Sequence, residues 1–286
     1  MKKILLSITL VLILCTQALA ESSVWKVQKG ASVFFLGGTF HLLRPSDFPL
    51  PPEFEKAYKA SDILVFETDL GTLNDISAQQ KLMANAMYAD GSTIDKYLSA
   101  GTYSLLDKYC AAHGIPLESL KHFKPSIIAV TLLSVELAKL GVAQQGVDTY
   151  LYQLATQDKK ATEGLETIDE QIQFMTRMGE GNEDAFITYS LKDLESIQQK
   201  YETMVAAWKK GDAKKLNDLF VAEVKTKMPK LYKELLADRN AKWLLAIDAY
   251  HRTPRKEFIL VGASHLVGPD GIIEALRQKG YTVEKL

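Results

Sequence analysis

The sequence contains very little cysteine, only Cys15 and Cys110 among 286 residues. Because Cys15 lies in an N-terminal segment that we expect to be removed, the mature chain can form no internal disulfide. Charge is balanced too, with 34 basic and 35 acidic residues and no basic patch or stripe. These absences exclude a small disulfide-stapled domain and remove nucleic acid from the expected partners. Cys110 itself follows an amphipathic helical pattern, which favours a buried structural thiol.

Several widespread catalytic motifs are also missing. The chain has no His-Glu-x-x-His pattern, no phosphate-binding loop and no dinucleotide-binding fingerprint, and Gly37-Gly38 have the wrong spacing for the last of these. Ser264 lacks the second glycine that a Gly-x-Ser-x-Gly nucleophile elbow needs. The common zincins, the serine hydrolases of the elbow type and the nucleotide-binding enzymes are therefore disfavoured.

The chain's longest apolar run is short and lies at its start. Lys2 and Lys3 precede the mostly apolar residues 4–15, and Ala18-Leu19-Ala20 fits the small-x-small cleavage rule. A membrane-spanning helix needs about 20 apolar residues. We therefore expect a signal peptide over residues 1–20, cleaved after Ala20, and a periplasmic or secreted protein without a stable membrane anchor.

One short pattern occurs twice, once near each end of the chain. The apolar residues 33–36 lead into Gly38-Thr39-Phe40-His41, and the apolar residues 258–261 lead into Gly262-Ala263-Ser264-His265. A helix and a further strand are expected after each copy, over residues 53–60 and 63–67 and over residues 271–279 and 281–286. Both ends of the chain therefore read as β-loop-α-β units.

These units predict the fold class. We expect an α/β (α+β) protein whose mixed sheet is formed by the N- and C-terminal units, with a large helical insertion over roughly residues 75–250. Residues 21–286 then form a single domain. Such units favour parallel pairing, and we expect the strand that ends near Glu67 beside the strand that leads to His41. Ligand sites in such sheets lie at the carboxyl ends of strands.

Three residues at those strand ends are candidates for chemistry. His41 and His265 suit metal binding and proton transfer near neutral pH. Glu67 follows four apolar residues and can ligate a metal or act as a general base, with Asp69 as a competitor. Two histidines and a carboxylate suit zinc, manganese, iron or cobalt, and the sequence alone does not choose among them.

An ordered set of short segments gives the chain a family resemblance. The segments are Gly38-Thr39-Phe40-His41, Phe66-Glu67-Thr68-Asp69, Gly146-Val147-Asp148-Thr149-Tyr150-Leu151, Gly164-Leu165-Glu166-Thr167, Asp238-Arg239-Asn240 and Gly262-Ala263-Ser264-His265. In their order and spacing the chain resembles bacterial members of the TraB/PrgY/GumN family, which also includes the animal Tiki proteins. Tiki proteins are described as metal-dependent proteases that use two Gly-x-x-His motifs with a glutamate and an arginine.

The resemblance adds roles to the candidate residues. It implies metal ligation by His41, His265 and Glu67, and it brings in Arg239, which unaided reads as a surface residue. It also brings in Glu166, as a further ligand or as a residue that orients a histidine. Because Tiki proteins are associated with manganese or cobalt, these metals are favoured, and zinc stays possible.

Three functions follow as hypotheses. The leading one is an exported metal-dependent hydrolase, a peptidase acting on peptides or proteins, in which Glu67 or Glu166 takes a proton and Arg239 stabilises developing negative charge. The second is a non-catalytic periplasmic protein that binds a peptide or pheromone in the same cleft. The third is capture of haem or iron through His41 or His265.

Overall fold

The computed structural model describes residues 22–286 except residues 74 and 144. The expected signal peptide, residues 1–20, and its cleavage site lie outside the described residues. The described residues form six strands: β1 (Val24–Lys29), β2 (Ser32–Thr39), β3 (Ile63–Thr68), β4 (Ala161–Glu166), β5 (Glu257–Gly262) and β6 (Thr282–Lys285). These strands form one mixed sheet in the order β4-β3-β5-β2-β1-β6.

Strands from the two ends of the chain alternate in the centre of this sheet. β5 pairs in parallel with both β2 and β3, and β4 pairs in parallel with β3. β1 pairs antiparallel with both β2 and β6. The expected mixed sheet is thereby confirmed. The expectation that β3 lies beside β2 is wrong, because β5 is inserted between them.

The helices surround this sheet and fill the middle of the chain. They are α1 (Pro52–Ala60), α2 (Leu70–Leu73), α3 (Ile76–Ala86), α4 (Ala100–Ala112), α5 (Pro125–Lys139), α6 (Val147–Asp158), α7 (Ile168–Arg177), α8 (Glu183–Leu194), α9 (Ile197–Lys209), α10 (Ala213–Leu216), α11 (Ala222–Lys227), α12 (Pro229–Tyr232), α13 (Asp238–Ala249), α14 (Ala263–Leu266) and α15 (Ile272–Gln278). Single 3₁₀ turns cover Pro45–Asp47, Ile94–Lys96, Leu117–Ser119 and Tyr250–Arg252, and π-helical turns cover Asn217–Val221 and Lys233–Ala237.

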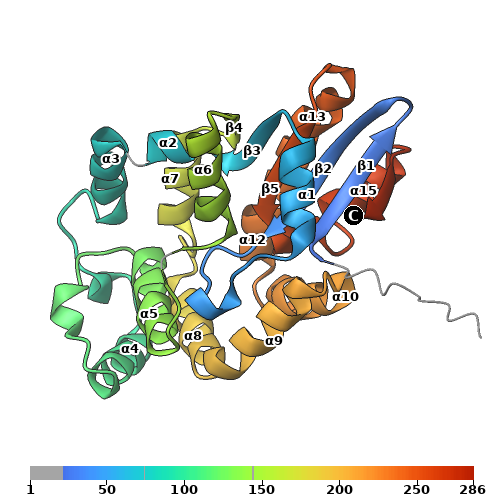
Figure 1. Ribbon diagram of the computed structural model, residues 1–286. Helices are drawn as coiled ribbons and strands as arrows, with labels where there is room; N and C mark the ends of the chain where they lie inside the picture. Colours follow the sequence, from blue (N-terminus) through green and yellow to red (C-terminus); the bar gives the residue numbers. More distant parts are fainter. Residues whose placement is uncertain (1–21, 74, 144) are drawn as a thin grey trace, which may run out of the picture.

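One local expectation needs correction. Residues 262–265 are not a loop, because β5 extends through Gly262 and the helix α14 begins at the next residue. The helical middle also contains a strand, β4, which forms one edge of the sheet beside β3. Helices α3, α4, α5 and α8 lie to the left of the sheet in Figure 1, away from the strands.

The connections that follow β2 and β5 show at which end of the sheet a crevice forms. β2 connects through α1 to β3, whereas β5 connects through α15 to β6 at the opposite edge. Since such crossovers are right-handed, connections that run in opposite directions lie on opposite faces. Figure 1 shows α1 in front of the sheet and α15 behind it. The carboxyl ends of adjacent strands with this arrangement form a crevice, which is where α/β sheets bind ligands.

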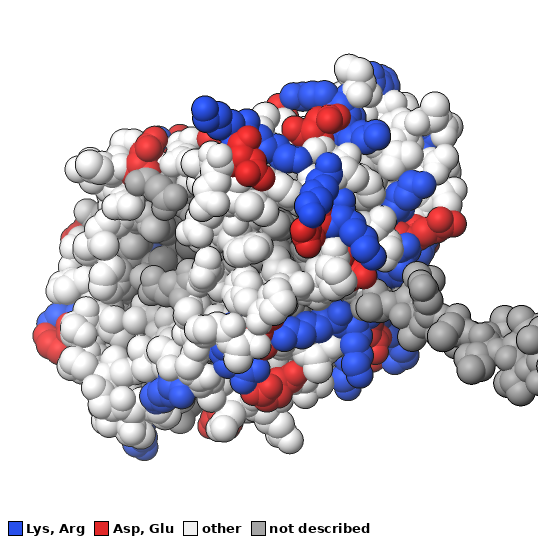
Figure 2. Space-filling view, viewed as in Figure 1, with Lys and Arg blue, Asp and Glu red and all other residues white. Residues whose placement is uncertain are grey.

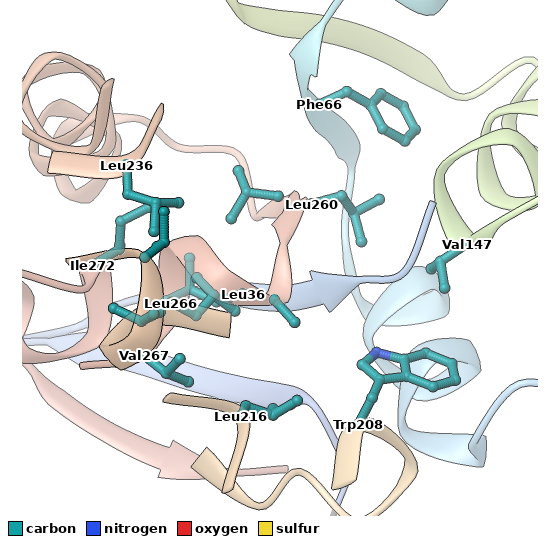
Figure 3. Close-up of a cluster of buried hydrophobic side chains, with 14 of the residues drawn as sticks. Leu36, Phe66, Val147, Trp208, Leu216, Leu236, Leu260, Leu266, Val267 and Ile272 are labelled. Carbon is teal, nitrogen blue, oxygen red and sulfur yellow. The ribbon is translucent and has the colours of Figure 1, made fainter. Parts of the chain in front are cut away.

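The core joins parts of the chain that are far apart in sequence. Figure 3 shows Leu36 of β2, Leu266 and Ile272 of the C-terminal unit, Trp208 of α9 and Val147 of α6 in one cluster of buried side chains. Trp208 is fully buried and donates its indole N–H to the Gly38 carbonyl at 2.7 Å. Cys110 is buried within α4, which confirms its predicted burial. Burial of such large side chains supplies most of the stabilisation that fixes the strand ends.

None of the helices among the described residues is both long enough and apolar enough to cross a membrane.

Candidate functional site

His41 is held by the segment that precedes α6. A β-carbon at Gly146 would lie 2.2 Å from the backbone of His41, so only glycine allows the two segments to approach this closely. The Val147 N–H donates to the Phe40 carbonyl at 3.0 Å and fixes the start of α6 against the end of β2. The next residue, Asp148, then reaches the imidazole, with Oδ2 at 2.9 Å from Nδ1 of His41.

This carboxylate determines which nitrogen of His41 is free. Asp148 accepts a hydrogen bond, so in the neutral imidazole, the form that binds a metal, Nδ1 carries the proton and the lone pair is on Nε2, which faces the site. Desolvation alone would lower the pKa of His41, but the charge and hydrogen bond of Asp148 outweigh it and raise the pKa. The imidazole is 62 % exposed, so solvent screens part of both effects. His41 is thus an exposed, carboxylate-oriented imidazole.

Glu67 lies near the end of β3 and is buried. Its Oε1 accepts the Gly262 N–H at 2.7 Å, and its Oε2 accepts a hydrogen bond from Arg239 Nη2 at 2.8 Å. Burial alone would raise the pKa of Glu67, but these donors and the surrounding positive charge lower it, so the carboxylate is ionised. The competing acid, Asp69, instead accepts hydrogen bonds from Gly71 and Thr72 at the start of α2.

Arg239, near the start of α13, joins the two candidate glutamates. Its Nη2 donates to Glu67 and to Glu166 Oε1, both at 2.8 Å, and its Nε donates to Glu166 Oε2 at 3.2 Å. The guanidinium also lies over the rings of Phe174 and Trp243, at 4.4 and 4.5 Å from their centroids. The Trp243 indole N–H donates to Glu166 at 3.1 Å. Glu166 therefore holds Arg239 and Trp243 in place, and other residues orient the histidines.

Asn240, the neighbour of Arg239, orients His265. Its amide nitrogen donates to the carbonyls of His265 and Asp270 at 3.2 and 2.9 Å, so its Oδ1 must be the atom that faces His265 Nδ1, at 2.6 Å. This acceptor requires the proton of His265 to be on Nδ1, so the lone pair is on Nε2, where it faces Arg239 Nη1 at 3.3 Å. Burial lowers the pKa of His265 to about 3, and the neutral imidazole is the form that binds metals.

The three candidate ligands converge on one point beside Gly262. A β-carbon there would lie 3.3 Å from Glu67 Oε1, 3.4 Å from His41 Nε2 and 3.6 Å from His265 Cδ2. Gly262 therefore borders the point at which His41 after β2, Glu67 of β3 and His265 of α14 meet. The five residues singled out by sequence, His41, Glu67, Glu166, Arg239 and His265, all belong to this one cluster.

The donor set fits a transition metal in its chemistry. Both histidines have Nδ1 held by an oxygen acceptor, which is the arrangement that directs Nε2 toward a metal, and Glu67 adds an ionised carboxylate. Among residues 22–286 without 74 and 144, no three His, Cys, Asp or Glu side chains already form a closed metal-binding group. Arg239 contacts two of the candidate ligands. It donates to Glu67, and its Nη1 lies 3.3 Å from His265 Nε2.

Two residues of the site, Asp148 and Asn240, are absent from the sequence-based candidates. Both lie within segments that carry the family resemblance, and Asn240 directly follows Arg239. Their place in these segments was the only sign of a role in the site. The hydrogen bonds themselves join residues 107 and 25 positions apart, so they leave no local sequence pattern.

Comparison with known proteins identifies the family. The family model described as the TraB/PrgY/gumN family matches residues 23–285. The chain belongs to the TraB/PrgY/gumN family. The strand-end cluster is thus a feature of a TraB/PrgY/gumN protein, and the match covers all the residues that form it.

Curated relatives are similar to this TraB/PrgY/gumN chain over most of its length. Metalloprotease TIKI2 of Xenopus tropicalis is 26 % identical over 92 % of this chain and 60 % of its own length. Metalloprotease TIKI1 of the same species is 23 % identical, and that of Danio rerio 24 %, over 93 and 92 % of this chain. The chain spans 60–63 % of the length of these relatives. No solved structure matches the chain.

Two cavities adjoin the cluster. One, of about 650 Å³, is lined by Arg239 and Glu166 together with charged residues of α7 and α13. The other, of about 240 Å³, is lined by His41, Gly262 and mainly apolar side chains. Figure 2 shows basic and acidic side chains interspersed on the visible face, so this face presents no patch of a single charge.

Proposed function

We propose that the protein is an exported, metal-dependent peptidase. The observation that carries this proposal is the convergence of His41 Nε2, Glu67 Oε1 and the His265 ring beside Gly262, in a chain whose relatives are metalloproteases. In the proposed site, His41, His265 and Glu67 hold one divalent transition metal, with manganese or cobalt favoured over zinc by kinship. A bound metal lowers the pKa of water and polarises a carbonyl group.

Three side chains, Glu67, Glu166 and Arg239, have separate roles beside the metal. Glu67 is the carboxylate beside both histidines, whereas Glu166 contacts Arg239 and Trp243. Glu67 is accordingly the residue placed to accept a proton from an attacking water, and Glu166 fixes the guanidinium. Of the two Nη1 hydrogens of Arg239, the described contacts engage one, with His265. The second can donate to the oxyanion that forms on the substrate carbonyl.

Metal content and peptide cleavage, measured together, test the proposal. The mature protein, produced without chelator, should contain about one equivalent of metal and cleave peptides, and His41→Ala and His265→Ala should lose both. Glu67→Gln separates its two roles, because a lost ligand removes the metal and a lost base leaves it bound. Full metal content and activity in both histidine variants would refute the site.

A second outcome would redefine the function of the same cleft. If peptide is recovered intact from a saturated complex after long incubation with manganese, cobalt and zinc, the protein binds peptides without cleaving them. If haem titration produces a Soret band that His41→Ala abolishes, the cleft binds haem instead.

Export is a separate part of the proposal. It rests on Lys2, Lys3, the apolar residues 4–15 and Ala18-Leu19-Ala20. N-terminal sequencing of the protein from a periplasmic or culture fraction should begin at Glu21. A chain that keeps its first twenty residues would contradict cleavage.

A further inference from the structure

The smaller cavity beside the cluster has an apolar lining. Its volume is about 240 Å³. Side chains from four separate segments line it: Phe40 and Leu42 after β2, Leu133 and Leu137 of α5, Met204 of α9, and Phe220. An engineered apolar cavity of about 150 Å³ is already large enough to bind benzene. This cavity therefore has room for one large apolar side chain and is too small for a folded segment.

The polar groups around this cavity are few and mostly engaged. The Tyr201 hydroxyl donates toward the Leu42 carbonyl and Asp47, both at 3.3 Å, so its polar end is already used. The Thr39 hydroxyl is buried and has no hydrogen-bond partner among the described residues. The lining therefore offers a bound group little besides apolar contact.

The cavity is continuous with the proposed reaction site. His41 and Gly262 both line it, and the same two residues bound the point on which the candidate ligands converge. A side chain in this cavity belongs to a residue whose backbone lies directly beside that point. The other cavity, with Arg239 and Glu166 in its wall, is lined largely by charged side chains, whereas the lining of the smaller one is mainly apolar.

We propose that the apolar cavity receives a leucine, methionine or phenylalanine side chain of the peptide substrate, at a residue next to the scissile bond. This inference rests on the proposed peptidase function. It makes the protein selective for large apolar residues at that position, because the cavity gives no compensation to a charged side chain and loses contacts with a small one.

Peptide sets that differ in one residue test the selectivity. Octapeptides with a common alanine–glycine background carry Leu, Phe, Ala or Glu at one central position, and mass spectrometry locates each cut. The metal-loaded wild type should cut next to Leu or Phe at least about tenfold faster than next to Ala. Met204→Trp, which fills the cavity, should abolish this ratio, and Leu133→Ala, which enlarges it, should shift the preference toward Phe.

Ile76→Trp is the matched control, because it adds the same side chain at a position on α3 that is 74 % exposed, and it should keep the wild-type ratio. Cleavage without apolar preference, or a preference unchanged in both cavity variants, would overturn the inference and leave the peptidase intact. If no peptide is cut, titration of the Leu and Ala peptides decides. If the Leu peptide binds more tightly than the Ala peptide and Met204→Trp abolishes this difference, the cavity is a side-chain site but the protein is not a peptidase. If the two peptides bind equally, the cavity is not a side-chain site.

Discussion

Asp148 accepts a hydrogen bond from His41 across 107 residues of sequence, with 2.9 Å between Oδ2 and Nδ1. Asn240 stands in the same relation to His265, at 2.6 Å. Each of the two motif histidines therefore has its own acceptor, supplied by a helix of the middle segment. Both acceptors place the lone pair of the neutral imidazole on Nε2, which is why the middle of the chain belongs to the site as much as the two ends do.

Removing the acceptor of His41 should weaken metal binding. Loss of such an orienting partner typically costs 10–100-fold in metal affinity. We expect Asp148→Ala to reduce affinity by about this factor, measured by titration with manganese or cobalt. Asp158→Asn is the matched control on the same helix, because Asp158 bonds only the Tyr58 hydroxyl among the contacts described, at 2.7 Å. Equal affinities in the two variants would show that Asp148 does not orient a ligand.

Arg239 should be essential for stability as well as for chemistry. Its removal leaves the buried carboxylates of Glu67 and Glu166 without their shared cation, and breaking a buried ion pair costs about 3–5 kcal/mol. We expect Arg239→Ala to lower the free energy of unfolding by about this amount in denaturant titrations. Arg239→Lys should cost less but still destabilise, because an ammonium group cannot form the same fork to both glutamates.

A surface pair provides the comparison for Arg239. Arg255 lies 3.3 Å from Glu163, and both side chains are nearly half exposed. Exposed pairs contribute about 0–1 kcal/mol. Arg255→Ala should therefore leave the free energy of unfolding almost unchanged. A similar cost in the Arg239 and Arg255 variants would contradict the buried network.

A methyl group at Gly262 should disturb the site without unfolding the protein. The added carbon would lie within 3.3–3.6 Å of Glu67, His41 and His265, which is tight but not a backbone clash. We expect Gly262→Ala to keep its circular dichroism spectrum and to lose about tenfold or more in metal affinity. Gly101→Ala, in open space near the start of α4, is the control and should change neither property. Wild-type affinity in Gly262→Ala would place the metal elsewhere.

Asp47 should make stability depend on pH. Burial alone would raise the pKa of Asp47, but hydrogen bonds from Arg44 and Lys209, each at 3.1 Å, lower it below its ordinary value. A depressed carboxyl pKa stabilises the fold above the unfolded pKa of about 3.9, and this stabilisation is lost as pH falls through the folded pKa. Asp47→Asn should therefore be less stable than wild type at pH 7, by about 1.5–3 kcal/mol for charged hydrogen bonds.

The difference between wild type and Asp47→Asn should shrink as pH falls below about 4, in urea titrations at pH 7, 5 and 3. Asp218→Asn, at an exposed ion pair with Lys214, should show a much smaller difference at pH 7. If the difference in free energy of unfolding between wild type and Asp47→Asn were independent of pH, the charge of Asp47 would not stabilise the fold.

Local pattern was enough to predict the elements that end at the site. The apolar runs before Gly38 and Gly262 predict strands β2 and β5, because alternating and buried strands follow from side-chain periodicity. The segments that resemble the family singled out His41, Glu67, Glu166, Arg239 and His265, and the structure brings all five together. The role of Glu166 differs from its expected contact with a histidine, since it binds Arg239 and Trp243.

The sequence by itself determined that each end of the chain forms a strand followed by a histidine, because glycine spacing and apolar runs act locally. Only the tertiary structure decided that β5 lies between β2 and β3, that residues 263–266 form α14, and that Asp148 and Asn240 orient the histidines. The physical reason is that strand order and hydrogen-bond partners depend on packing between distant segments, for which residue periodicity carries no signal.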